Sequence, residues 1–475
     1  MADMIGITSW GAYLPVYRLG RDELARAWGG RSAGGQKAVA CYDEDSVTMS
    51  VAAARDCLDG FDGEKPGGLY LATTTPPYRE KQSATIVAAA LDCPPETRTA
   101  DIANSLRSGT IAMNFALDGI RGGRAGSVLV AASDCRLGPP RGEFESLIGD
   151  GAAAILFGNS NVVATVEASH SVSNELMDVW RPEKSVYVQS AEDRFILAKG
   201  YREIVGRTVR ELLKKAGLAP KDISKVILYS PDARSSAALA KSLGFDAGTQ
   251  LQDPLIGAIG HTGTASTFLS LAAALEEAKP GERLLLAGYG DGCDAFVLAV
   301  TDEIEKRRGH RGVRKHLQSK TLPVGYEKYL LWRGQVEVEA LRRLDPAVPA
   351  PSALLRERRQ ILALHGQKCR RCGTPQFGRT VLCIQCQARD EFDDYRFSDR
   401  KAKVATYTAE GATQAMDPPR IMCVIDFEGG GRMLAELTDR EPGQIRIGLP
   451  VEMTFRKLQD AKGIHHYFWK CKSSE

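Results

Sequence analysis

The chain has 475 residues, too many for one ordinary hydrophobic core, so we expect two or three domains. Its formal net charge of +3 gives no general reason to expect a nucleic-acid partner, and no apolar run approaches the roughly 20 residues of a membrane span. The first residues lack the basic and apolar regions of a secretion signal, so we expect a cytoplasmic protein that binds neither nucleic acid nor membrane.

Short apolar strands alternate with longer helical patterns up to about residue 300. The strand-like runs are 68–75, 125–134, 224–231 and 283–292. Helical spacing of apolar residues occurs between them, for example over 45–58 and 201–217. This alternation predicts an α/β fold built around buried sheets.

One internal repeat is visible in this part of the chain. The segments "GDGAAAILFG" (149–158) and "GDGCDAFVLAV" (290–300) share a Gly-Asp-Gly turn that leads into an apolar strand. Such a turn can be ordinary turn chemistry. Because the surrounding elements also follow in the same order, we interpret the repeat as a duplication, with halves of about 1–165 and 166–345.

The composition changes after Thr301. The segment "DEIEKRRGHRGVRKH" is dense in basic residues, and "LDPAVPAPSALL" has the proline and alanine content of a linker. A domain boundary near 345–355 follows. Further on, β-rich runs separated by glycine, proline and aspartate predict a small barrel.

Four of the eleven cysteines cluster in "CRRCGTPQFGRTVLCIQC". Two Cys-x-x-Cys pairs let four thiolates converge tetrahedrally, and soft sulfur ligands favour zinc. The alternative is four unligated thiols. Four sulfur ligands leave no position for a catalytic water, so we expect a structural Zn²⁺ site. Its ligands would be Cys369, Cys372, Cys383 and Cys386.

Longer motifs carry a resemblance to known families. The segments "IGITSWGAYLPVYRLGRDELARAWG", "YDEDSVTMSVAAARDCL" and "AKPGERLLLAGYGDGCDAF" resemble the archaeal and bacterial hydroxymethylglutaryl-CoA synthases of the thiolase superfamily. The four cysteines and "RIMCVIDFEGGGRMLAELTDREPGQIRIGLPVEMTFRK" resemble a DUF35 domain, which is a zinc ribbon followed by an OB-fold. The resemblance implies a duplicated, five-layer αβαβα thiolase fold followed by a zinc ribbon and a small β-barrel. The implied parts are a thiolase-fold domain (1–345), a linker (346–358), the zinc ribbon (359–390) and the OB-fold (391–475).

The same resemblance implies a function. It implies a homodimer through the thiolase fold and a coenzyme A thioester as substrate. Family DUF35 domains bind coenzyme A and connect synthase-like subunits to thiolases. The basic run 305–315 could contact the phosphates of coenzyme A or could be a solvated surface.

The active-site residues of the synthases do not carry over. The position of the nucleophilic cysteine, in "DIANSLRSGT", falls on Leu106, and the general-acid glutamate falls on Thr74. The catalytic histidine falls on Tyr229. The asparagine of a Gly-Asn-Thr motif falls on His261, where thiolases carry a catalytic histidine. We therefore do not expect standard hydroxymethylglutaryl-CoA synthase activity.

Other polar residues could replace the missing ones. Ser105 and Ser108 flank Leu106, but an unactivated serine needs a base within hydrogen-bond reach. Cys293 is interpreted as a small packing residue. Tyr229 and His261 could stabilise a thioester enolate and move a proton, or could be structural remnants of a former site.

Three functional hypotheses remain. The first is a subunit of a thiolase-type acyltransferase complex that makes or breaks C–C bonds of acyl-CoA together with a separate, cysteine-bearing thiolase. The second is a non-catalytic scaffold subunit. The third is a cysteine-independent aldolase or retro-aldolase that uses Tyr229 and His261, by resemblance to thiolase-fold aldolases that act with DUF35 partners.

Overall fold

The structure is a computed structural model, in which the chain forms two compact units. The described residues are 4–32, 34–61, 63–191, 193–309, 311–339, 348–411 and 415–474. Unit 1 comprises Met1–Ala40, Asp45–Ala88 and Cys93–Tyr326, and unit 2 comprises Cys41–Glu44, Ala89–Asp92 and Glu327–Glu475.

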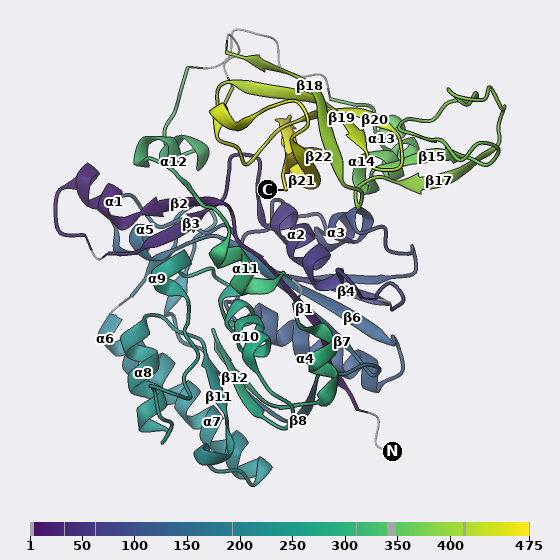
Figure 1. Ribbon diagram of the computed structural model, residues 1–475. Helices are drawn as coiled ribbons and strands as arrows, with labels where there is room; N and C mark the ends of the chain where they lie inside the picture. The colour runs from purple at the N-terminus through teal and green to yellow at the C-terminus, as the bar shows by residue number, and fades with distance from the viewer. Residues whose placement is uncertain are drawn as a thin grey trace. The chain divides into compact units, whose positions relative to one another are not determined.

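Unit 1 is organised around a nine-stranded mixed sheet with the order β11-β12-β13-β8-β1-β7-β6-β4-β5 (Figure 1). Its strands are β1 (Gly6–Tyr13), β4 (Gly68–Thr73), β5 (Arg98–Ala103), β6 (Ser127–Asp134), β7 (Gly151–Gly158), β8 (Ala164–Ser173), β11 (Lys225–Leu228), β12 (Arg283–Tyr289) and β13 (Gly292–Val300). The order is nearly symmetric about the β1–β8 boundary, because β6-β7-β1 in one half corresponds to β12-β13-β8 in the other. The α/β prediction is confirmed.

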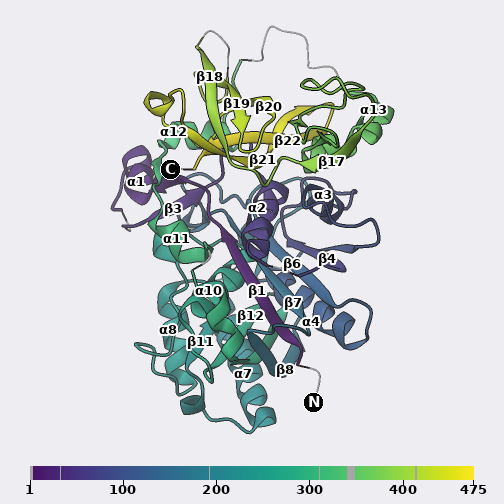
Figure 2. The ribbon, with the colours of Figure 1, turned by 45° about the vertical axis from the view of Figure 1, so that its right-hand side comes forward.

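The two half-sheets are joined at a short antiparallel contact between β1 and β8. Gly6 pairs with Thr165, and Ile7 pairs with Ala164. A Cβ on Gly6 would lie 2.0 Å from the carbonyl oxygen of Ala164, so only glycine permits this approach. Figure 2 shows β1, in purple, running through the middle of unit 1.

Helices cover both faces of this sheet. The helix α2 (Ser46–Leu58) packs against β1, β6 and β7, and α7 (Glu203–Ala216) packs against β8, β12 and β13. Between them, α4 (Ser108–Arg121) and α10 (Ala265–Glu277) contact each other and the opposite faces of the half-sheets. The resulting core cluster contains residues from Ile7 to Val313.

The sequence predicted the positions of these helices closely. Asp45 caps α2 by accepting the Thr48 N–H at 2.9 Å, in a reciprocal capping box. The second predicted helix, 201–217, corresponds to α7, which continues a π-helix (Ile196–Arg202). The remaining α-helices of unit 1 are α1 (Arg21–Trp28), α3 (Ala84–Ala90), α5 (Glu143–Leu147), α6 (Asp193–Phe195), α8 (Ala233–Ser242), α9 (Ile256–Ile259) and α11 (Gly312–Gln318). The helix α12 (Tyr326–Trp332) begins at the last residue of unit 1 and belongs otherwise to unit 2.

Smaller strands lie outside the main sheet. They are β2 (Tyr17–Gly20), β3 (Gln36–Val39) and β14 (Leu322–Pro323) in one small sheet, and β9 (Val179–Trp180) and β10 (Gln189–Ser190) in another. Within the described residues, every helix is too short or too polar to cross a bilayer.

Unit 2 contains a three-stranded sheet and a five-stranded barrel. The first has the order β16-β15-β17, and the second has the order β20-β19-β18-β21-β22. Its elements are α13 (Pro351–Arg356), α14 (Arg358–Ala363), β15 (His365–Cys369), β16 (Pro375–Gln376), β17 (Phe392–Arg396), β18 (Ala402–Glu410), β19 (Arg420–Phe427), β20 (Arg432–Glu436), β21 (Pro450–Ala461) and β22 (Ile464–Ser473). A bridge between Leu437 and Cys471 brings the two edge strands together, which matches the predicted small barrel.

Two short segments from the first hundred residues also belong to unit 2. In one of them, the buried carboxylate of Asp43 forms ion pairs with Arg456 at 3.2 Å and with Lys470 at 2.9 Å. Glu44 contacts the same guanidinium at 2.8 Å. Burial alone would raise the pKa of Asp43, but the two cations hold it below its ordinary value. The barrel therefore shares a buried charge network with residues 41–44.

Candidate active site and metal centre

The turn between β5 and α4 carries Leu106, which we expect from the sequence at the nucleophile position. The side chain of Leu106 is partly buried and packs against the core of the second half. A Cβ on Gly290 would lie 3.0 Å from the backbone nitrogens of Leu106 and Arg107. Glycine at position 290 thus lets the second Gly-Asp-Gly turn lie close to the turn that carries Leu106.

The two serines of this turn lack an activating base. Ser105 Oγ donates to the carbonyl oxygen of Gly290 at 3.1 Å. Ser108 Oγ is buried and has no hydrogen-bond partner within the described ranges. A serine nucleophile needs a base that takes its proton, so neither hydroxyl is set up for attack.

An ion pair fixes the same turn to the second half of unit 1. Arg107 contacts Asp294 on β13 at 3.2 Å, and Thr110 donates to the same carboxylate at 2.8 Å. Arg107 also donates to the carbonyl oxygen of Asp291 at 3.1 Å. These polar contacts therefore hold the Leu106 turn against β13 and against the turn that precedes β13.

A cavity of about 350 Å³ opens beside Leu106. Thr74, at the position of the general acid, lines it as well. The Thr74 N–H donates to Asp134 Oδ1 at 2.6 Å, while its own buried hydroxyl has no partner among the described residues. The charged residues of the lining include Arg136, Asp178, Arg181 and Asp291. The cavity is thus lined by charged groups beside Leu106 and Thr74.

His261 lies in the glycine-rich turn between α9 and α10. Its N–H donates to the carbonyl oxygen of Leu147 at 2.8 Å, and its Nδ1 accepts the Gly263 N–H at 3.2 Å. Burial, reinforced by the positive charge of Arg136, lowers the pKa of His261 to about 3. The imidazole is therefore neutral and carries its hydrogen on Nε2. This buried nitrogen has no hydrogen-bond partner in the parts of the chain that the structure describes.

Tyr229 follows β11 and lies beside His261, with ring centroids 5.2 Å apart. Its ring also packs against Tyr201 and Tyr289, at 6.1 Å and 5.6 Å. Burial raises the pKa of Tyr229, so its hydroxyl stays protonated. Neither Tyr229 nor His261 is among the described residues that line the cavity. Arg136 lines the cavity and acts electrostatically on both.

Asp134 connects the acid position with the histidine turn. Its Oδ1 accepts from Thr73 Oγ1 at 3.0 Å and from the Thr74 N–H, and its Oδ2 accepts the Thr264 N–H at 2.8 Å. A Cβ on Gly263 would lie 2.1 Å from this Oδ2. One carboxylate thus positions loops from both halves.

Sequence reasoning missed three polar residues of this region. Asp178 and Arg136 line the cavity, and Tyr289 donates to Asp178 Oδ2 at 2.7 Å. Arg136 comes directly after β6, and polar residues after a strand of an α/β sheet are a usual signal for a site. Asp178 lies in a segment with no strong periodicity, so no such signal marked it.

The structure also shows the surroundings of Cys293 and of the basic run 305–315. Cys293 is fully buried, and burial raises the pKa of its thiol to about 12, which suits a packing residue. In the basic run, Arg307 donates to the carbonyl oxygen of Asp59 at 3.1 Å, and Arg308 donates to that of Glu276 at 2.7 Å. These two guanidinium groups therefore bind backbone carbonyls.

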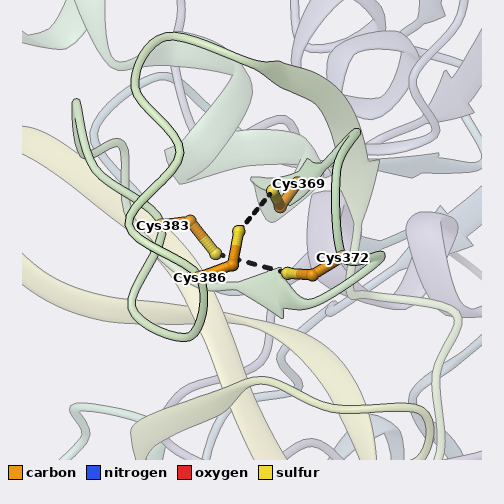
Figure 3. Close-up of side chains that lie close together, drawn as sticks. All are labelled: Cys369, Cys372, Cys383 and Cys386. Carbon is orange, nitrogen blue, oxygen red and sulfur yellow. Dashed lines mark hydrogen bonds between the residues drawn. The ribbon is translucent and has the colours of Figure 1, made fainter.

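The four clustered cysteines converge in unit 2 (Figure 3). All four Sγ atoms lie within 4.8 Å of one another, and two pairs are 3.5 Å and 3.6 Å apart. Sulfur atoms around a zinc ion with Zn–S bonds of about 2.3 Å would lie about 3.8 Å apart. The residues that converge are Cys369, Cys372, Cys383 and Cys386.

The two halves of this cluster have the same backbone turn. The Gly373 N–H donates to the Cys369 carbonyl oxygen at 2.9 Å, and the Gln387 N–H donates to the Cys383 carbonyl oxygen at 3.1 Å. Gly373 and Gln387 both have positive φ, at 73° and 59°. Two equivalent turns present four sulfur ligands to one point, which fits a tetrahedral metal ion.

Comparison with known families gives two matches. The family described as "ChsH2, C-terminal OB-fold domain" matches residues 395–456. The family described as "3-Oxoacyl-[acyl-carrier-protein (ACP)] synthase III C terminal" matches residues 213–301.

Individual relatives cover the rest of unit 1. A hydroxymethylglutaryl-CoA synthase of Methanosphaera stadtmanae is 32% identical over 346 residues, which are 70% of this chain and 100% of that protein. Its counterpart in Aeropyrum pernix is 34% identical over 348 residues, with 71% and 96% covered.

Solved structures share the fold. A hydroxymethylglutaryl-CoA synthase complexed with CoA is 22% identical with a TM-score of 0.63, over 69% of this chain and 89% of that one. The 3-oxoacyl-(acyl carrier protein) synthase III of Pseudomonas aeruginosa is also 22% identical, with a TM-score of 0.56, over 63% and 98%. These structural matches identify a thiolase-type fold.

Proposed function

Since this chain belongs to the hydroxymethylglutaryl-CoA synthase family, we propose that it takes part in making or breaking C–C bonds of acyl-CoA without carrying the acyl group on itself. It acts as a subunit of a complex in which a separate thiolase supplies the reactive cysteine. It is not a standard hydroxymethylglutaryl-CoA synthase.

The observation that carries this proposal is Leu106 beside a retained cavity. A leucine cannot be acylated, and the neighbouring serines lack a base. The cavity nevertheless keeps about 350 Å³ and buried charged side chains. Burying a charged side chain costs free energy, so a cavity that no longer binds a substrate would have no need to retain one.

Unit 2 supports the second part of the proposal. Its barrel matches a named OB-fold family over residues 395–456, and its four cysteines would hold a structural Zn²⁺. Such an ion would keep the loop-rich segment folded, because four thiolates leave it no open position. We assign to this unit the binding of coenzyme A and the docking of the thiolase, while the thiolase-type fold forms a homodimer.

A second candidate function is a cysteine-independent aldolase or retro-aldolase. The contact between Tyr229 and His261 favours it. A neutral imidazole with hydrogen on Nε2 is the kind of donor that stabilises a thioester enolate, and Arg136 connects the two rings electrostatically with the cavity, which they themselves do not line. This activity would belong to the chain itself.

Four preparations separate these functions: the chain alone, the chain with a co-expressed thiolase, and the His261→Ala and Tyr229→Phe variants. Release or uptake of acyl-CoA is measured in each case. Activity that requires the thiolase and survives both substitutions supports a scaffold role. Activity of the isolated chain that both substitutions abolish supports the aldolase.

Covalent labelling tests the central claim independently. We expect no stable incorporation of radioactivity when the isolated wild-type chain is incubated with labelled acetyl-CoA. A labelled thioester or ester on this chain would contradict the argument from Leu106.

A further inference from the structure

The cavity contains a buried carboxylate, Asp178, to which the proposed function assigns no role. Asp178 precedes β9 and is 7% exposed, yet it lines the cavity that Leu106 also lines. Its Oδ2 accepts the Tyr289 hydroxyl at 2.7 Å, and its Oδ1 accepts the Val179 N–H at 2.6 Å. Both oxygens are thus held in place by neutral donors, and no ion pair of this carboxylate is found within the described ranges.

The local backbone is shaped around the Tyr289 hydroxyl. Gly200 lies in the π-helix Ile196–Arg202, and a Cβ on Gly200 would be 2.4 Å from the Tyr289 hydroxyl oxygen. Single turns of π-helix occur frequently at functional sites. The Tyr289 ring also packs edge-on against Tyr201 at 5.8 Å. The hydroxyl is therefore fixed between Gly200 and Asp178.

The charges around Asp178 leave it suited to proton transfer. The groups that face it are Tyr289 and Asp291 at the end of β12, Tyr229 at the end of β11, and Arg136 after β6. Burial raises the pKa of the Asp178 carboxyl, although the hydrogen bond from Tyr289 works against that rise. A carboxylate with a raised pKa is a stronger base than an ordinary one, and its position at the cavity lets it take a proton from a bound substrate and return it.

We propose that Asp178 is the general base and acid of this cavity and that Tyr289 is its positioning residue, an inference that rests on the second candidate function above, the cysteine-independent aldolase or retro-aldolase. The substrate class is a 3-hydroxyacyl thioester in the cleavage direction, or an acyl thioester and a carbonyl compound in the synthetic direction.

The cleavage step balances without a further reactant. Asp178 takes the proton of the 3-hydroxyl group, the Cα–Cβ bond breaks, and its electron pair moves into the thioester as an enolate. A carbonyl compound leaves from Cβ. Arg136, which lines the same cavity, stabilises the enolate oxygen. The protonated Asp178 then gives the proton to Cα, and the product is a shortened acyl thioester.

Exchange of the Cα protons of acetyl-CoA in D₂O tests this role in the full-length protein. Deuterium uptake is followed by mass spectrometry, and binding of acetyl-CoA is measured separately by calorimetry. We expect the wild type to bind acetyl-CoA and to exchange its Cα protons. We expect Asp178→Asn to bind acetyl-CoA but to exchange these protons at least about 100-fold more slowly. The matched control is Glu183→Gln, which alters an acidic residue of the same segment whose side chain is 75% exposed. We expect this control to exchange like the wild type.

Tyr289→Phe gives a second readout, which a merely structural role would not move. Exchange needs ionised Asp178 and rises with pH through its pKa. Removing the hydrogen bond from Tyr289 raises this pKa further, so the rise should move to higher pH, with the maximum rate retained. This variant also decides the question if Asp178→Asn does not fold.

The possible failures are distinguishable. Undiminished exchange in Asp178→Asn, or wild-type binding without exchange, overturns the role of Asp178 and leaves the acyl-CoA function standing. An unmoved pH profile in Tyr289→Phe overturns the role of Tyr289. Failure of the wild type to bind acetyl-CoA overturns the proposed function, and the role of Asp178 with it.

Discussion

Arg107 and Asp294 form a salt bridge of 3.2 Å that joins the turn before α4 to β13, with only 11% and 2% of their side chains exposed. The residue next to Leu106 thus helps to hold two halves of one fold together. Removing one partner of a buried pair leaves the other charge without compensation.

We therefore expect Arg107→Ala to lower the free energy of unfolding by about 3 kcal/mol in urea denaturation. Arg121→Ala is the matched control, because Arg121 ends the helix that Arg107 precedes and pairs with Asp118 in an exposed position. Its loss should stay below about 1 kcal/mol. Equal losses in the two variants would show that burial of the Arg107 pair has no particular effect.

Leu106→Cys returns a thiol to the cavity wall but should not restore synthase activity. Thr74 and Tyr229 still occupy the positions of the acid and the histidine, so the later steps lack their proton donors. Peptide mapping after iodoacetamide treatment should find the introduced thiol alkylated and the buried Cys293 unmodified. Formation of hydroxymethylglutaryl-CoA by this single variant would refute the argument.

The cysteine cluster predicts about one zinc ion per chain by elemental analysis. Cys372→Ser should lower the zinc content and, like a chelator, lower the melting temperature of the protein. Cys93→Ala, which removes a thiol outside the cluster, should keep the zinc. Wild-type protein purified without chelators that holds no metal would contradict this assignment.

His261 should make stability depend on acid pH in a defined direction. Its pKa is lowered from 6.5 to about 3 in the folded chain, so the unfolded chain binds more protons between these values. The stability that the folded chain gains by keeping His261 neutral is fully present above pH 6.5 and is lost as the pH falls towards 3. Denaturation curves at several pH values should show a shallower decline for His261→Gln than for the wild type. An identical decline would mean that the imidazole is protonated like one in water.

Local patterns in the sequence predicted much of the fold. The apolar spacing over 45–58 locates α2, and the apolar runs locate β4, β6, β11 and β12 to within a few positions. Tyr229 and His261 were paired through a family resemblance, and their rings are in contact.

Pairs that the fold creates over long distances were not predictable from one sequence. Asp178 and Tyr289 are 111 positions apart, and Arg107 and Asp294 are 187 positions apart. No periodicity or spacing connects such residues, because their contact depends on the sheet that aligns β12 and β13 with the turns beside them. The cavity carboxylate therefore became visible only with the tertiary structure.

The ion pairs of Asp43 have a consequence for how such a chain can arise. A gene fragment that encodes only Glu327–Glu475 would keep Asp439 beside Arg456 and Glu436 beside Lys470, but it would lack Asp43 and Glu44. Its buried charge network would therefore be short of two carboxylates, which costs stability. A recombination event at the linker would therefore transfer a barrel with an incomplete buried charge network, and new acidic residues near Arg456 and Lys470 would raise its stability.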